Sequence, residues 1–255
     1  MGKKVHNKPS VRKEQPTKEV SVKSMPVKKR NEVSQLADKL LRISTLPPPQ
    51  NISKAIELHN EVDEIIAKLI NIEASIDVPA GNRCNSATIK KFTNWVEENG
   101  ANFEGLTIEE FSGYELGIKA ERDITQGSLV ISVPRKLMIT LEAAKKSVLG
   151  SLIEKDKMLQ NMPNVTLAMF LLLEKFTANS FWKPYIDILP KSYTTVLYFT
   201  KEELFELRES PTFASALNLI KSIARQYAYF NKLVQTSDDP AAEMLRNVFT
   251  YEQYR

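Results

Sequence analysis

Apolar residues recur at helical spacing in several long stretches of the chain, and this spacing predicts most of its elements. Apolar side chains three or four positions apart mark one face of an amphipathic helix. We therefore expect helices over 31–43, 53–69, 86–98, 141–148, 165–176, 201–208 and 213–235. The stretch at 165–176 is apolar on most faces, which is typical of a buried helix.

Between the third and fourth of these helices the spacing changes to that of strands. Leu106, Ile108 and Phe111 suggest a short strand, and β-branched and aromatic residues favour further strands over 114–120 and 129–133. Pro134 directly follows the last of these and would end it. The chain is therefore expected to have an α+β fold.

Positive charge is concentrated at the beginning of the chain. Residues 1–30 contain ten Lys or Arg and two Glu, whereas the remaining residues contain 25 basic and 29 acidic side chains. The first stretch is poor in apolar residues, so we expect a disordered basic tail over 1–31, then a helical segment over 32–105 and a mixed segment over 106–255. Such a tail either keeps the protein soluble or makes weak contacts with phosphates and acidic surfaces.

Composition and motifs exclude several classes of protein. Cys84 is the single cysteine, so no disulfide forms within the chain, and with two histidines a metal site is not expected. The longest nearly apolar run, 165–173, is too short to cross a bilayer, so no membrane partner is expected. No P-loop, Rossmann fingerprint, G-x-S-x-G or H-E-x-x-H motif occurs. Without a resemblance to known proteins, the residues indicate only a soluble intracellular domain of mixed structure.

Three sets of polar and aromatic residues are expected to have structural rather than chemical roles. His59 lies in a helical stretch and is expected at the helix surface or its boundary. Phe181, Trp182 and Tyr185 are expected to be core aromatics rather than substrate contacts. Thr250 and Gln253 have the spacing of a capping box, which predicts the start of a helix.

Several segments together resemble one enzyme family. They are GYELGIKAERDI at 113–124, GSLVISVPRKLM at 127–138, SFWKPYI at 180–186, ARQYAYF at 224–230 and FTYEQYR at 249–255. With these segments the chain resembles the N-terminal portion of SET-domain protein methyltransferases of the Rubisco-methyltransferase class, and within that class the actin-histidine type. The resemblance covers roughly residues 31–255.

The resemblance implies a fold and an activity. The fold would be the first part of a SET-domain β-fold, with N-terminal helices and a largely helical insertion from about residue 140. The activity would be protein methylation with S-adenosyl-L-methionine, with actin as the substrate, in the cytoplasm or the nucleus. Two alternatives stay open: a protein-lysine methyltransferase of the same class, and a non-catalytic module that binds actin or chromatin. Nucleic acid is not an expected partner, apart from weak contact by the basic tail.

The resemblance also implies cofactor-binding residues. Main-chain groups of Tyr114, Glu115 and Leu116 would hold the cofactor, although Glu115 stands where the family has glycine. Glycines on both sides, Gly113 and Gly117, permit tight backbone geometry and close approach of a ligand. Arg83 matches a basic residue that contacts the cofactor in the family.

No catalytic residue can be assigned from the resemblance. The family's asparagine–histidine cofactor motif and its cage tyrosine do not occur in this sequence. We therefore expect this chain to be truncated and inactive on its own.

Overall fold

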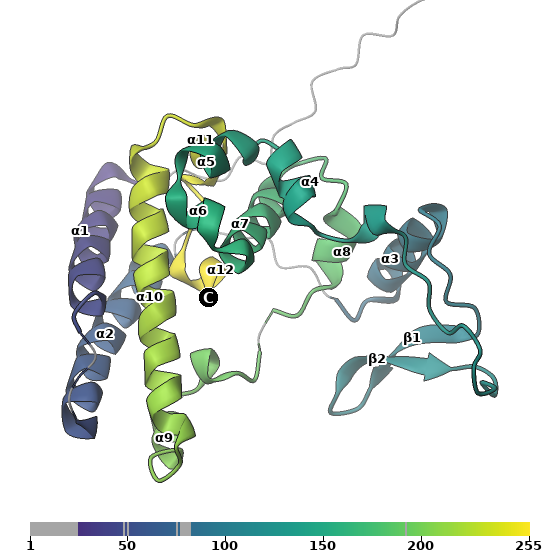
Figure 1. Ribbon diagram of the computed structural model, residues 1–255, viewed down its shortest axis with the longest axis horizontal. Helices are drawn as coiled ribbons and strands as arrows, with labels where there is room; N and C mark the ends of the chain where they lie inside the picture. The colour runs from purple at the N-terminus through teal and green to yellow at the C-terminus, as the bar shows by residue number, and fades with distance from the viewer. Residues whose placement is uncertain (1–24, 48, 50, 75, 77–82, 192) are drawn as a thin grey trace, which may run out of the picture.

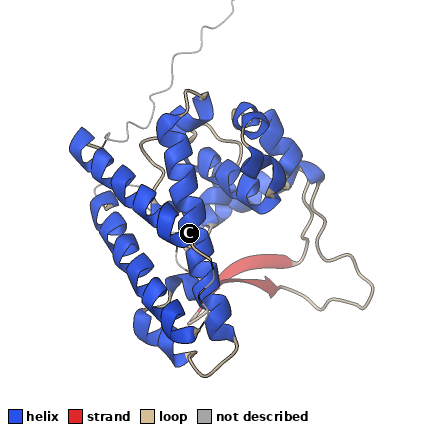
Figure 2. Cartoon of the chain, turned by 60° about the vertical axis from the view of Figure 1, so that its left-hand side comes forward, coloured by secondary structure: helices blue, strands red, loops and turns tan. Residues whose placement is uncertain are grey.

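The computed structural model describes residues 25–47, 49, 51–74, 76, 83–191 and 193–255. Within these residues helices dominate and two strands form one antiparallel sheet, so the α+β prediction is confirmed (Figures 1 and 2). The α-helices are α1 (Val27–Ser44), α2 (Ile52–Glu73), α3 (Ser86–Glu98), α4 (Leu141–Lys146), α5 (Gly150–Lys155), α6 (Lys157–Asn161), α7 (Pro163–Phe176), α8 (Lys183–Ile188), α9 (Lys201–Glu206), α10 (Thr212–Thr236), α11 (Pro240–Leu245) and α12 (Tyr251–Tyr254). The strands are β1 (Leu106–Phe111) and β2 (Glu115–Ala120), and Arg135–Leu137 and Val196–Tyr198 form short 3-10 helices.

Three long helices, α1, α2 and α10, pack side by side (Figure 1). Their apolar faces meet in the core, with Leu40 and Leu69 among the side chains that are fully buried. Helix α1 begins at Val27, inside the predicted tail and directly after Pro26. Its first buried residue is Val33, so more than one turn of the helix precedes the residues that enter the core. Residues 1–24 of the predicted tail lie outside the described residues.

Helix α2 departs from the prediction in two respects. It begins at Ile52, one residue before the predicted start at residue 53, and Asn51 caps it, since the Asn51 side chain accepts a hydrogen bond from the Lys54 amide at 2.9 Å. His59 is buried with 8% exposure, whereas the sequence predicted a surface or boundary position. It lies one turn from buried Val62 on the face that packs into the core. Burial lowers the pKa of His59, and the charge of Lys201 lowers it further against the opposing effect of Asp63.

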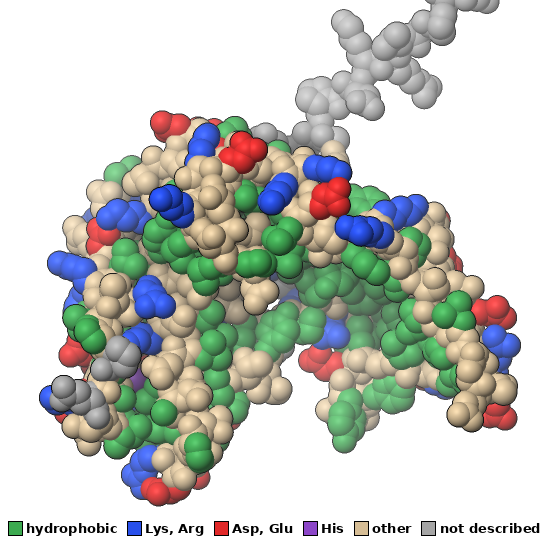
Figure 3. All heavy atoms as spheres, viewed as in Figure 1, with side chains coloured by type: hydrophobic (Ala, Val, Ile, Leu, Met, Phe, Trp, Pro, Cys, Tyr) green, Lys and Arg blue, Asp and Glu red, His purple; other side chains and the backbone are tan. Residues whose placement is uncertain are grey.

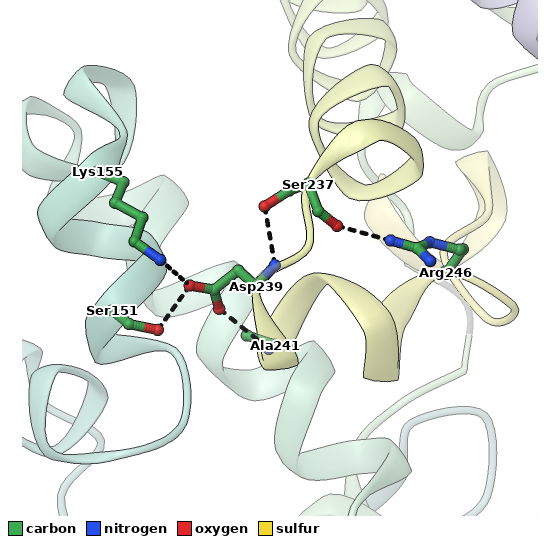
Figure 4. A network of polar contacts seen from close by, with 6 residues as sticks. All are labelled: Ser151, Lys155, Ser237, Asp239, Ala241 and Arg246. Carbon is green, nitrogen blue, oxygen red and sulfur yellow. Dashed lines mark hydrogen bonds and ion pairs between the residues drawn. The ribbon is translucent and has the colours of Figure 1, made fainter.

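Helix α7 forms a second layer of the core together with the short helices around it. Its buried residues include Met169 and Phe170, as its apolar sequence predicted. A polar network fixes α5 against the start of α11 (Figure 4). Asp239 accepts hydrogen bonds from Ser151 Oγ at 2.7 Å, Lys155 Nζ at 3.0 Å and the Ala241 amide at 3.1 Å. This one carboxylate therefore both caps α11 and joins it to α5.

The strands lie beside α3, at one side of the helical body (Figure 1). Trp95 of α3 packs edge-on against Phe181 and Trp182, with ring centroids 5.2 Å and 6.0 Å apart. These aromatic contacts join α3 to the start of α8. The prediction of core aromatics holds for Trp182, which is 7% exposed, but not for Phe181, which is 45% exposed.

The predicted strand at 129–133 is wrong. In the part of the chain that the structure describes, this segment forms only an isolated bridge between Ser132 and Asn102. A strand requires a partner that completes its hydrogen bonds, and here no neighbouring strand lies beside the segment. Leu129 is consequently 79% exposed despite its strand-forming surroundings.

Candidate cofactor site at the hairpin turn

The turn between β1 and β2, together with the start of β2, contains three of the four predicted cofactor-binding residues: Tyr114, Glu115 and Leu116. The strands pair antiparallel, with Phe111 opposite Glu115, and residues 112–114 form the turn. The Tyr114 amide donates a hydrogen bond to the Phe111 carbonyl at 2.9 Å and closes it. Gly113 has a φ of 80°, and a side chain added there would meet nothing within 4 Å. The turn therefore presents a bare, accessible stretch of backbone.

Glu115 adopts a backbone conformation that favours glycine. Its φ is 57°, in the left-handed region, and among the described residues it is the non-glycine residue with a positive φ. A side chain in this region costs roughly 1–2 kcal/mol because the β-carbon crowds the following carbonyl. The position where the family has glycine thus keeps a glycine-like backbone while carrying a carboxylate.

Arg83 is brought to this turn by an ion pair. Its Nη1 lies 2.8 Å from Glu115 Oε2, and the two side chains are 17% and 61% exposed. Arg83 Nε is buried and has no hydrogen-bond partner among the described residues. The structure thus joins two predicted cofactor residues that are separated by 32 positions in the sequence.

The other two predicted residues differ in their surroundings. Tyr114 is 85% exposed and extends from the turn, whereas Leu116 is half-buried and pairs with Glu110 across the sheet. In the described part of the chain the sheet has two strands, so the outer edge of β2 has main-chain groups without a neighbouring strand. These groups are accessible to a ligand, as main-chain binding of the cofactor requires.

Gly117 is required for a different reason than the sequence suggested. The positive φ values at this turn belong to Gly113 and Glu115. A β-carbon on Gly117 would lie 2.8 Å from two atoms of the Phe111 ring. The absence of a side chain at Gly117 therefore makes space for the Phe111 ring of the neighbouring strand. It does not serve a backbone conformation that only glycine adopts easily.

The guanidinium of Arg83 suits one charged group of S-adenosyl-L-methionine. The cofactor carries an amino-acid carboxylate, and a guanidinium such as that of Arg83 binds carboxylates through two parallel hydrogen bonds. The Nη end of Arg83 and the open backbone at Gly113 are the parts of this site that a ligand could reach. Among the described residues no cluster of His, Cys, Asp or Glu could hold a metal ion.

Large apolar side chains of the hairpin and of the segment that follows β2 are exposed to solvent. They include Tyr114, Ile118, Ile124, Leu129, Val130 and Ile131. Figure 3 shows a hollow between the helical body and this part of the molecule, with hydrophobic side chains along it. Apolar surface along a hollow is typical of a face that contacts another polypeptide segment.

A cavity on the helical side of the molecule was not predicted from the sequence. Its volume is about 760 Å³, and residues from α7, α8 and α12 line it. The Arg255 guanidinium lies over the Tyr198 ring at 4.4 Å from its centroid in this cavity. No sequence signal identified it, because its walls come from segments far apart in the sequence: Lys175 and Gln253, which are joined by a hydrogen bond, are 78 positions apart.

Comparison with solved structures identifies the class of fold. The chain matches a structure of the SET domain of LSMT bound to lysine and AdoHcy with a TM-score of 0.57, and a structure of Rubisco LSMT bound to AdoMet with a TM-score of 0.53. Each match covers 67% of this chain and 38% of the other, at 24% and 23% identity. The fold is therefore that of the SET-domain methyltransferases, as the resemblance predicted.

Comparison of sequences identifies the relatives within this class. The chain is 38% identical over 224 residues to actin-histidine N-methyltransferase of Gallus gallus, and 37% identical over 227 residues to that of Homo sapiens. Each match covers 88% of this chain, which spans 37% of the length of these relatives. No family model matches the chain. The chain is thus a relative of the actin-histidine N-methyltransferases, and the resemblance seen in its motifs is confirmed.

The length and apolar character of a helix decide whether it could cross a membrane. Within the described residues, none of the helices has the length and apolar character that crossing a membrane requires.

Proposed function

We propose that this chain contains the cofactor-binding turn of an S-adenosyl-L-methionine-dependent protein methyltransferase that acts on a histidine of actin. The observation that carries the proposal is its 37–38% identity to actin-histidine N-methyltransferases over 88% of the chain. The accessible turn at residues 113–116, with an arginine beside it, supports the same activity. Actin binding, and a location in the cytoplasm or nucleus, belong to this proposal.

Each part of the turn has a role in this proposal. Arg83 would bind the carboxylate of the cofactor, because its guanidinium is largely desolvated and faces the turn. Main-chain groups of Tyr114, Glu115 and Leu116 would orient the cofactor, since backbone donors and acceptors fixed by a hairpin need little reorganisation. The bound cofactor supplies the methyl group of its sulfonium. These residues position the cofactor, and none of them transfers a proton.

The alternatives differ in what they would modify or bind. A lysine methyltransferase of the same class would use the same turn but methylate a different nitrogen. A non-catalytic module that binds actin would use the exposed apolar side chains of the hairpin and of the segment after it, and would not need the cofactor. The sequence relatives favour histidine methylation of actin over both.

Cofactor binding is the first test. Titration calorimetry of S-adenosyl-L-methionine on the chain should detect binding, and Arg83→Ala should weaken it by about tenfold or more, as expected for a charge-assisted hydrogen bond. Arg122→Ala is the matched control, because Arg122 is 62% exposed and pairs with Glu104 of the same region. Equal losses in the two variants would contradict the assignment of Arg83.

Methyl transfer is the second test. Labelled cofactor is incubated with purified actin and the protein, and mass spectrometry locates the modified residue. A methylated histidine would support the proposal and would overturn the expectation that this chain is inactive on its own, whereas a methylated lysine would support the first alternative. Binding of actin by a chain without affinity for the cofactor would support the non-catalytic module.

A further inference from the structure

We infer that the carboxylate of Glu115 competes with the carboxylate of the cofactor for Arg83, so that this chain carries an internal competitor in its own cofactor site. The inference rests on the proposed function, because it requires that the turn binds S-adenosyl-L-methionine. It goes further by giving a role to the residue at which this chain departs from the family. The contact that carries it is the 2.8 Å ion pair between Arg83 Nη1 and Glu115 Oε2.

The geometry of Arg83 restricts how it can bind a carboxylate. Its Nε is buried and is not accessible to an incoming ligand. The accessible donors are therefore at the Nη end, and Glu115 already occupies Nη1 there. A cofactor carboxylate that binds this end must displace Glu115 or share the guanidinium with a like charge. Either alternative weakens binding relative to a turn with glycine at this position.

Glu115 differs in this from the other acidic residues of the hairpin. Glu109 lies 3.0 Å from Lys119 and Glu121 lies 3.6 Å from the same lysine, so both pair with the hairpin itself. Glu115 instead pairs with a residue that precedes α3. Glu115 has a left-handed backbone conformation that glycine would adopt more freely, and its carboxylate lies against the Arg83 guanidinium, the group predicted to bind the cofactor.

The size of the effect follows from the exposure of the pair. Glu115 is 61% exposed, and ion pairs exposed to this degree are weak because water screens them. Competition from such a pair reduces ligand affinity by about threefold to fivefold. The competitor therefore tunes the site and does not abolish binding.

The test is the sign of the change in cofactor affinity when the charge is removed. Glu115→Gln keeps the length of the side chain and removes its charge, and we expect a Kd for S-adenosyl-L-methionine about threefold to fivefold lower by calorimetry. Glu110→Gln is the matched control, because Glu110 is exposed on β1 and lies opposite Leu116, next to Glu115. The gain should shrink at high salt, and it should vanish when Arg83→Ala is present.

Each other outcome overturns the inference in a different way. Weaker binding by Glu115→Gln would mean that Glu115 holds the cationic groups of the cofactor instead of competing with it. Equal binding by the wild type and both variants would remove Glu115 from the site and leave the proposed function standing. An absence of binding by all folded variants, including the wild type, would refute both. Circular dichroism and melting temperatures establish that each variant is folded.

Discussion

The buried carboxyl group of Glu73 should make the stability of this protein fall as the pH rises toward neutrality. Glu73 ends α2 and is 3% exposed. The hydroxyl of Tyr227 donates a hydrogen bond to one of its oxygens, and the Tyr251 amide donates to the other at 2.8 Å. This one side chain therefore joins α2 to α10 and to the start of α12.

Burial determines the charge state of Glu73. Removal from water raises the pKa of its carboxyl from 4.5 to about 7, and the nearby charge of Glu252 adds to the rise. The hydrogen bonds from Tyr227 and Tyr251 lower this pKa, but they offset only part of the effect of burial. In the unfolded chain the group has its ordinary pKa and ionises in water.

The sign and size of the effect follow from proton linkage. Below pH 4.5 both states hold the proton, and the contribution of Glu73 to folding is complete. Between pH 4.5 and about 7 the unfolded chain releases the proton while the folded chain keeps it, so each pH unit lowers the free energy of unfolding by about 1.4 kcal/mol. The total loss across this window is about 3 kcal/mol, and the contribution is constant at higher pH.

Urea unfolding at a series of pH values from 4.5 to 8 measures this loss. Glu73→Gln removes the titration, so its free energy of unfolding relative to the wild type should rise by about 3 kcal/mol between the two ends of the series. Glu64→Gln, at an exposed position of the same helix, controls for the loss of a carboxylate. A difference between Glu73→Gln and wild type that does not change with pH, or that falls as the pH rises, would refute the reasoning.

Three further substitutions test other contacts, each by urea unfolding at neutral pH. Asp239→Ala should lower the free energy of unfolding by about 2–4 kcal/mol, because it leaves a buried helix cap unmade and breaks an ion pair, whereas Asp238→Ala at the exposed neighbour should change it little. Gly117→Val should cost about 1–3 kcal/mol because its side chain would overlap the Phe111 ring, and Phe111→Ala in the same chain should recover part of this loss. Thr250→Ala should cost about 1 kcal/mol, since the Thr250 hydroxyl caps α12 by accepting from the Gln253 amide at 3.2 Å, and an unchanged stability would mean that this cap contributes nothing.

Local patterns predicted the helices well because apolar spacing and core packing agree in them. Helix α3 has its predicted bounds, and the ends of α7 and α10 differ from their predicted positions by no more than two residues. The short helices α5, α6, α8 and α11 were not predicted, since a few residues carry too little periodicity to be recognised. The strand predicted at 129–133 shows the opposite limit, because strand formation depends on a partner that local sequence does not reveal.

Long-range contacts explain the remaining differences. The burial of His59 and the carboxyl of Glu73 depends on α10, which is more than a hundred positions away in the sequence, as the contact between Glu73 and Tyr227 shows. A polar residue in an amphipathic pattern gives no sign of whether a distant partner will cover it. The sequence alone therefore places His59 at the surface or boundary of its helix and gives no role to Glu73.

The cofactor site combines both situations. The sequence showed that Glu115 replaces a family glycine, but not what the replacement does. Backbone geometry is preserved, since Glu115 adopts a φ of 57° where glycine would adopt such a value without strain. Charge is not preserved, because the new carboxylate lies 2.8 Å from Arg83. A substitution that keeps the main chain and alters the electrostatics should leave main-chain contacts with the cofactor intact and change only its affinity through Arg83. Under the proposed function, the departure from the family pattern is thus better explained as a change in binding strength than as the loss of the site.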